Sequence, residues 1–185
     1  MAERLFVAAN SLSGGRGTRF ACTRYGNIAG SRGSVIPLWR EAIRARKALE
    51  ETDLAATRFH MRQDQAVDLV VLALREMRGG EIFVPILPSY CLGDLAEVIA
   101  GPGYPAEIIG LRPAEKLHEV LIGAEEARST VIVNGVYRIL PEIHPWRGEE
   151  PVDPACFVAP RFEYRSDAAP LSRKELRALL LREGA

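Results

Sequence analysis

Three short polar segments carry the residue types that could bind a charged or sugar-like ligand. They are Arg24–Ser34 (RYGNIAGSRGS), Thr57-Arg58-Phe59, and Gly110–Glu119 (GLRPAEKLHE). Arginine offers paired, permanently charged donors that suit phosphate groups, and glycine lets the backbone approach a ligand closely. The first segment follows a predicted strand, and in open α/β sheets the carboxyl ends of strands face the ligand crevice. We therefore take the three segments as the candidate binding site.

Each candidate residue also has a plain structural interpretation. Arg58 and Arg112 could be surface partners of acidic side chains, and Asn27 could be a turn residue that accepts from its own backbone. Taken alone, the residues leave both interpretations open.

Other chemistries lack their signatures. The run Gly14–Gly17 follows a predicted helix and precedes a strand, whereas a phosphate-binding turn must lead from a strand into a helix. We therefore predict a plain turn there. No tyrosine has a lysine four residues later, so a reductase-type pair is absent. His60, His118 and His144 lie in separate segments without carboxylates or cysteines at ligand spacing, so we predict no metal site.

Composition narrows the class of protein. The chain has 185 residues, and its 24 Lys and Arg balance 24 Asp and Glu. A zero net charge argues against a general nucleic-acid binder. No apolar run approaches the ~20 residues of a membrane-spanning helix, and the first residues lack the layout of a signal peptide. We therefore expect a cytoplasmic protein without a membrane partner, in which Cys22, Cys91 and Cys156 are small buried free thiols.

Local patterns predict alternating helices and strands, which indicate an α/β fold with a partly parallel sheet. The predicted helices are Glu3–Ala9, 37–48, Asp64–Met77, Leu92–Ala100, 114–121, and a final one capped by Ser172 and Glu175. The predicted strands are Arg19–Tyr25, Glu81–Ile86, Ala106–Leu111, and a hairpin of 130–133 and 136–140 around Asn134-Gly135. The remaining stretches, including 11–17, 49–59 and 142–160, are predicted to be loops. The first helix has no capping residue before it, as if it continued an earlier one.

Several of these stretches together resemble the UDP-N-acetylglucosamine 4,6-dehydratases of bacterial polysaccharide and flagellin-glycan biosynthesis. These are extended short-chain dehydrogenase/reductase (SDR) proteins, also described as capsular polysaccharide biosynthesis proteins. The matching stretches, in the family's order, are Arg24–Val35, Thr52-Asp53, Thr57-Arg58-Phe59, Gly79–Pro85, Gly110–Glu119 and the tail Tyr164–Asp167. This chain departs from the family pattern at Ala56, Ile86 and Ala114, where the family has Met, Lys and Gly.

The resemblance implies the C-terminal part of a Rossmann-type extended SDR fold, with the N-terminal nucleotide-binding half missing. We expect 1–35 to be a remnant of the Rossmann domain and 36–141 to be a substrate-binding subdomain. A Rossmann strand is expected to return near 81–86, and 142–185 is expected to be a loop and a C-terminal helix. The family's catalytic lysine and acid/base residues would fall before Met1, so we assign no catalytic residue.

The resemblance also implies roles for individual residues. Asn27, Arg58, Arg112 and Glu115 match residues that bind the nucleotide sugar. The turn against the nicotinamide end of NADP corresponds to Ile28, Ala29, Gly30, Ser31 and Arg32.

The implied reaction is a lyase reaction on UDP-N-acetylglucosamine. NADP takes a hydride from carbon 4 of the hexose, water leaves from carbon 6, and the hydride returns there. We expect this chain to be inactive alone and to act as a homo-oligomer or paired with an N-terminal half. Two alternatives are a catalytically silent nucleotide-sugar-binding or assembly module, and a gene remnant that scarcely folds.

Overall fold

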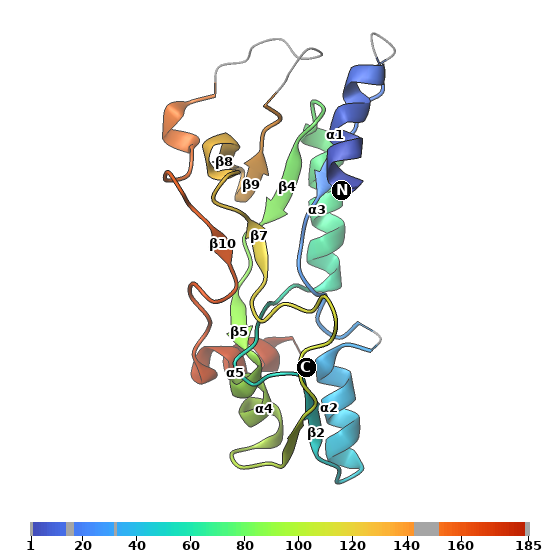
Figure 1. Ribbon diagram of the computed structural model, residues 1–185, viewed down its shortest axis with the longest axis vertical. Coiled ribbons are helices and arrows are strands. Elements are labelled where there is room, and N and C mark those ends of the chain that lie inside the picture. Colours follow the sequence, from blue (N-terminus) through green and yellow to red (C-terminus); the bar gives the residue numbers. More distant parts are fainter. Residues whose placement is uncertain (1, 14–16, 32, 143–151, 184–185) are drawn as a thin grey trace. The chain divides into compact units, whose positions relative to one another are not determined.

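The computed structural model describes residues 2–13, 17–31, 33–142 and 152–183 (Figure 1). Its helices are α1 (Ala2–Ser13), α2 (Val35–Arg44), α3 (Gln63–Glu76), α4 (Leu92–Ala100) and α5 (Arg173–Arg182). Its strands are β1 (Cys22–Thr23), β2 (Leu49–Glu51), β3 (Thr57–Phe59), β4 (Ile82–Pro85), β5 (Ser89–Cys91), β6 (Ala106–Ile108), β7 (Val120–Ile122), β8 (Thr130–Val133), β9 (Val136–Ile139) and β10 (Tyr164–Arg165).

Internal contacts divide the chain into two compact units. The first unit comprises Met1–Tyr25, Asp64–Ile86 and Leu121–Tyr164, and the second comprises Gly26–Gln63, Leu87–Val120 and Arg165–Ala185. The units interleave along the chain, whereas the boundaries expected at 35 and 141 follow chain order. Strand pairing explains the interleaving, because β1 pairs with β4 more than fifty residues later.

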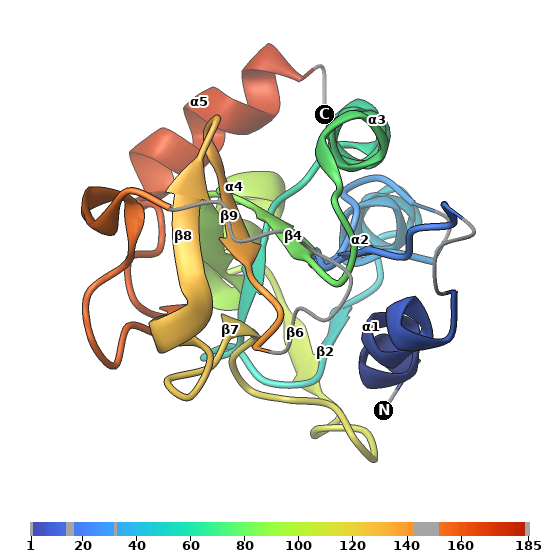
Figure 2. The same ribbon diagram turned by 90° about the horizontal axis from the view of Figure 1, so that it is seen from above.

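The first unit is built on a four-stranded sheet with the order β1-β4-β9-β8, in which β1 and β4 run parallel and the other pairs antiparallel. Figure 2 shows β8, β9 and β4 side by side. The predicted hairpin is confirmed: Asn134 and Gly135 have φ of 53° and 76°, as a two-residue type I′ turn requires. The sheet is therefore partly parallel, as predicted.

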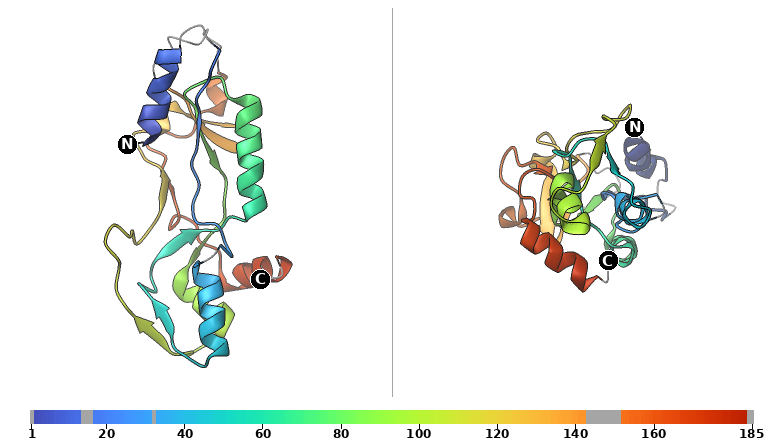
Figure 3. Two further views of the ribbon diagram at one scale, coloured as in Figure 1. Left: turned by 90° about the vertical axis from the view of Figure 1, so that its right-hand side faces the viewer. Right: turned by 90° about the horizontal axis from the view of Figure 1, so that it is seen from below.

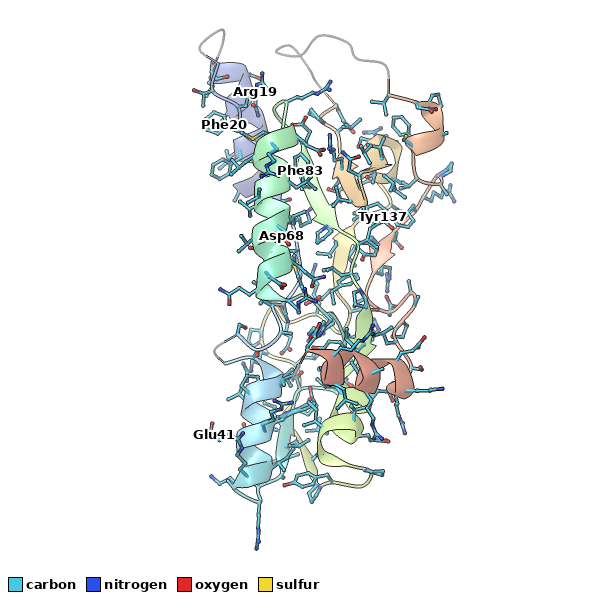
Figure 4. All side chains as sticks on the ribbon, turned by 180° about the vertical axis from the view of Figure 1, so that it is seen from behind. Arg19, Phe20, Glu41, Asp68, Phe83 and Tyr137 are labelled. Atoms are coloured by element: carbon cyan, nitrogen blue, oxygen red, sulfur yellow. The ribbon has the colours of Figure 1, made fainter. Side chains whose placement is uncertain are left out.

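Arg138 of β9 joins the sheet of the first unit to α3. Its guanidinium lies 5.0 Å from the ring centroid of Phe83 on β4 and pairs with Glu76 at the end of α3. Figure 4 labels Phe83 together with Tyr137, the β9 residue that is in register with Val84. Phe83 and Val84 are fully buried, so β4 is central to the core of this unit.

The second unit packs α2, α4 and α5 around an apolar cluster. Figure 3 shows the parallel pair β2 and β6 beside α2. The buried members of the cluster are Ile36, Trp39, Leu49, Ala56, Tyr90, Leu92, Leu95, Ala96, Leu176 and Leu180. The helix that carries the last two begins at the predicted capping box, in which Ser172 accepts from the amide of Glu175 and the Glu175 carboxylate accepts from the amide of Ser172. Burying a leucine contributes about 1.5–3 kcal/mol, so this cluster sets the position of the three helices.

Three local predictions are wrong. The helix predicted over 114–121 is absent; this stretch holds turns and then β7, because Ala114 adopts φ of 68°, outside the helical region. The stretch 49–59, predicted as a loop, contains β2 and β3, which pair with β6 and β5 from distant sequence. The first helix runs to Ser13, into the predicted loop of 11–17.

The three cysteines are free but half-buried rather than fully buried. No helix among the described residues is long and apolar enough to cross a membrane. The turn predicted at Gly14–Gly17 and the irregular stretch predicted at 142–160 lie partly outside the described residues, so their structure is not described there.

Candidate functional site

The second unit contains a cavity of about 980 Å³ that gathers most of the predicted site residues. The predicted residues that line it are Asn27, Ile28, Ala29, Ser31, Arg58, Arg112 and Glu115. Gly30 is exposed and does not line it, and Arg32 lies outside the described residues. Its apolar wall includes Trp39 and Leu92 from the core of the unit. Residues up to 88 positions apart in sequence therefore meet at one cavity, between Asn27 and Glu115.

Arg58 is the buried cation of this site, with only 7% of its surface exposed. It is the central residue of β3 and is paired with Tyr90 of β5. Its Nη1 donates to the carbonyl oxygens of Thr57 at 2.9 Å and Leu117 at 3.0 Å, and its Nη2 donates to Oε1 of Glu115 at 2.9 Å. These bonds use three of the five guanidinium N–H donors, and the other two make no hydrogen bond within the described residues.

Glu115 is held in position by three groups. Besides Arg58, the hydroxyl of Thr52 donates to Oε1 at 3.3 Å, and the amide of Arg112 donates to Oε2 at 3.2 Å. Burial by itself would raise the pKa of Glu115, but the Arg112 amide and the Arg58 guanidinium outweigh it and lower the pKa below the ordinary value. Glu115 is therefore an ionised, oriented acceptor at neutral pH.

Arg112 differs from Arg58 in its surroundings. It is exposed, and within the described part of the chain its guanidinium makes no hydrogen bond or ion pair. Its backbone carbonyl accepts from the amide of Glu115 at 2.9 Å, in the turn where Ala114 has positive φ. A fixed backbone with an unpaired guanidinium at the cavity is suited to binding an anion.

A further acid, Glu51 of β2, lines the same cavity and was not among the predicted site residues. It is 3% exposed, and its Oε1 accepts from the amide of Thr52 at 3.1 Å. Burial raises the pKa of Glu51 to about 7, although the amides of Thr52 and Asp53 and the charge of Arg58 act in the opposite direction. The sequence did hold one signal for this residue. Glu51 stands two residues after Leu49, so in a strand both side chains lie on the same face, where an apolar residue would be expected.

A buried hydroxyl network fixes the strand that carries Arg58. Oγ1 of Thr57 lies 2.9 Å from Nδ1 of His118 and 2.6 Å from Oγ of Ser166. The amide of Glu119 also donates to Oγ of Ser166, at 2.9 Å. Thr57 and Ser166 are 5% and 0% exposed, so neither hydroxyl can reach a ligand. The tail Tyr164–Asp167, singled out by resemblance, therefore contributes a structural residue.

The first polar segment has two roles. Arg24 lies in the first unit and pairs with Glu3 of α1 at 2.6 Å and Glu126 at 2.9 Å, so it is structural. Gly26 lies in the second unit, where an added Cβ would come within 3.1 Å of Cβ of Phe59 and 3.0 Å of Oε2 of Glu119. An added methyl group would therefore be tight against β3.

The turn after Gly26 has an open stretch of backbone. The amide of Ala29 donates to the carbonyl of Met61 at 2.8 Å, which fixes the turn to its own unit. Gly30 has φ of 74°, and nothing lies within 4 Å of where its Cβ would be, so a ligand could approach the backbone. Among the described residues no group of three or more His, Cys, Asp or Glu could hold a metal ion.

The fold and the site together define a class: the chain has the α/β arrangement of part of a Rossmann-type extended SDR protein. An X-ray structure of Pen from Bacillus thuringiensis superposes on 98% of this chain with a TM-score of 0.82 and 35% sequence identity, covering 54% of that chain. Residues 1–141 match the polysaccharide biosynthesis protein family, and the chain belongs to that family.

Two of the relatives that the chain matches have enzyme names. A UDP-N-acetylglucosamine 4,6-dehydratase (inverting) of Campylobacter jejuni is 43% identical over 142 residues, which are 76% of this chain and 42% of that protein. A UDP-glucose 4-epimerase of Rickettsia felis is 39% identical over 140 residues, 74% of this chain and 41% of that protein. The chain thus spans less than half the length of either relative.

Proposed function

We propose that the chain binds UDP-N-acetylglucosamine or a closely related UDP-sugar, as the substrate-binding part of a 4,6-dehydratase-like protein. The observation that carries this proposal is the Arg58–Glu115 pair beside the unpaired Arg112 at one cavity. All three residues stand at positions that match the family's motifs.

The proposed contacts follow from the charge of each group. Arg112 binds the diphosphate through its unpaired guanidinium, and the two remaining donors of Arg58 support it. Glu115, ionised and oriented, accepts from ribose hydroxyls. Asn27, exposed at the cavity, uses an amide that both donates and accepts to contact the sugar.

The relatives support the UDP part of the ligand most directly. Dehydratase and epimerase differ in reaction, yet both names contain a UDP-sugar, and both proteins match this chain over about three quarters of its length. Recognition of the shared UDP group by this part of the chain would explain that pattern. UDP-N-acetylglucosamine is preferred because the dehydratase has the higher identity of these two.

We further propose a cofactor and a partner for this chain. Ile28–Ser31 would hold the nicotinamide end of NADP, which would take up and return the hydride when bound. Within the expected remnant 1–35, β1 belongs to a Rossmann sheet together with the strand near 81–86, and the parallel pairing of β1 with β4 supports this. We assign no catalytic residue to this chain, and we propose that it acts in the cytoplasm as a homo-oligomer or paired with an N-terminal half.

Thermal melts with a ligand series test the binding proposal. UDP-N-acetylglucosamine and UDP should each raise the Tm. At a hundredfold excess over Kd, a bound ligand stabilises the folded state by about 2.7 kcal/mol. N-acetylglucosamine alone should leave the Tm unchanged, because it lacks the diphosphate. No shift with either UDP compound would contradict the proposal.

A non-catalytic nucleotide-sugar-binding module is the alternative, because no catalytic residue is assigned. The two are separated by mixing the chain with the purified N-terminal half of a relative, NADP and UDP-N-acetylglucosamine. A 4-keto-6-deoxy product would support the dehydratase proposal. Binding without product under those conditions would favour the module.

A further inference from the structure

Glu51 occupies a position on β2 where the strand pattern calls for an apolar residue. Leu49 and Glu51 are buried, while Glu50 between them is exposed. Leu49 belongs to the apolar cluster of the second unit, so the Glu51 carboxyl replaces an apolar side chain on the same strand face. A polar group buried in this way opposes folding unless it is hydrogen-bonded.

Only one of its two carboxyl oxygens is satisfied. Oε1 accepts from the amide of Thr52, whereas Oε2 is buried and has no partner with hydrogen-bond geometry among the described residues; the amide of Asp53 acts on the carboxyl without meeting that geometry. The side chain lines the cavity that also contains Arg58 and Glu115. Because the side chain lines this cavity, a donor on a molecule bound there could supply the hydrogen bond that Oε2 lacks.

We propose that Oε2 of Glu51 accepts a hydrogen bond from an uncharged donor of the bound nucleotide sugar, a hydroxyl or an N–H group, and so selects among ligands. The inference rests on the proposed function. A donor is required because phosphate oxygens only accept, and two anions would repel. The diphosphate is left to Arg112, so the two residues fix the ligand's orientation.

The groups around Glu51 affect its protonation, so this contact can be detected as a release of protons when the ligand binds. The groups that face it are Arg58 of β3, Glu115 from the turn after β6, and the amides of Thr52 and Asp53. Burial raises the pKa of Glu51 to about 7, so part of the population is protonated at neutral pH. A ligand donor favours the ionised form, and binding should therefore release protons from Glu51.

The test is calorimetry with UDP-N-acetylglucosamine at pH 6.5, in two buffers of different ionisation enthalpy, with a thermal melt of each variant. Glu51→Leu should bind at least about tenfold more weakly while its Tm does not fall. Glu51→Gln keeps an acceptor oxygen but should no longer release protons. Glu126→Gln is the matched control: it alters another half-buried acid, in the first unit and outside the cavity, and should keep affinity within about twofold.

Each result of these titrations supports or overturns the proposed role of Glu51. Glu51→Leu binding as tightly as wild type overturns the inference and leaves the proposed function standing. If Glu51→Leu does not melt cooperatively, Glu51→Gln decides: wild-type affinity together with wild-type proton release overturns the inference. Absence of binding by the wild type overturns the proposed function and this inference with it.

Discussion

Nη2 of Arg58 and Oε1 of Glu115 lie 2.9 Å apart, although 57 residues separate them in sequence. The pair joins β3 to the turn after β6, and the guanidinium also holds the carbonyls of Thr57 and Leu117. Arg58 thus stabilises the structure of the site through these hydrogen bonds, whereas the Arg112 side chain has no such partners in the described part of the chain. The two arginines should respond differently to substitution.

Arg58→Met is expected to lower the free energy of unfolding by about 3 kcal/mol, because it leaves Glu115 and two carbonyls without their donor. Arg112→Met, the matched control, should change it by no more than about 0.5 kcal/mol, since that side chain is exposed. Urea unfolding monitored by circular dichroism measures both. Equal stability of the two variants would contradict the structural role of Arg58.

Glu51 should make stability depend on pH. Its pKa is raised to about 7 in the folded state, so the folded chain holds the proton more tightly than the unfolded chain does. This contribution is fully present below about pH 4.5, the ordinary glutamate value, and is lost as the pH rises toward about 7. The loss should be on the order of 3 kcal/mol.

The corresponding measurement is urea unfolding between pH 4.5 and 8 for the wild type and Glu51→Gln. The difference in unfolding free energy between the two should change in favour of the variant as the pH rises. A difference that stays constant over this range would show that Glu51 does not titrate with a raised pKa.

Ala114→Gly is expected to stabilise the chain. The left-handed conformation of Ala114, with φ of 68°, costs an L-residue about 1–2 kcal/mol, and glycine avoids that cost. The greater backbone entropy of glycine in the unfolded chain costs about 0.5–1 kcal/mol, which leaves a net gain of up to about 1.5 kcal/mol. Ala106→Gly in β6 is the control and should destabilise; a lower Tm for Ala114→Gly would refute the argument.

Gly26→Ala should destabilise by about 1–3 kcal/mol, because its Cβ would press on Cβ of Phe59 in the buried strand β3. Gly123→Ala is a close control. Its Cβ would also make a tight contact, at 2.8 Å, but with the carboxylate of Glu125, which can turn away. Thermal melts should show a clear loss for the first variant and little for the second. Similar losses of Tm in the two variants would contradict the importance of the contact between position 26 and Phe59.

Local signals in the sequence predicted much of the fold. The helix at Leu92–Ala100, the final helix after the Ser172 cap, and the hairpin at Asn134-Gly135 each depend on neighbouring residues, and the structure confirms them. The strands β2 and β3 are three residues long and exist because of partners 30 or more positions away. No local pattern records such pairing.

The site was predictable only in part, for a similar reason. Resemblance indicated Asn27, Arg58, Arg112 and Glu115, and the structure brings them to one cavity. Glu51 was not indicated, because its burial depends on the pairing of β2 with β6. Ala114 misled the helix prediction, since alanine favours helices and its positive φ follows from the turn that positions Arg112 and Glu115.

The most direct test of the account is a calorimetric titration of the chain with UDP-N-acetylglucosamine, wild type against Arg112→Met. We predict one binding site per chain. The affinity should be at least about tenfold weaker in the variant, because a charge-assisted contact to the diphosphate is lost. Absence of binding by the wild type, or equal affinity of the two proteins, would contradict it.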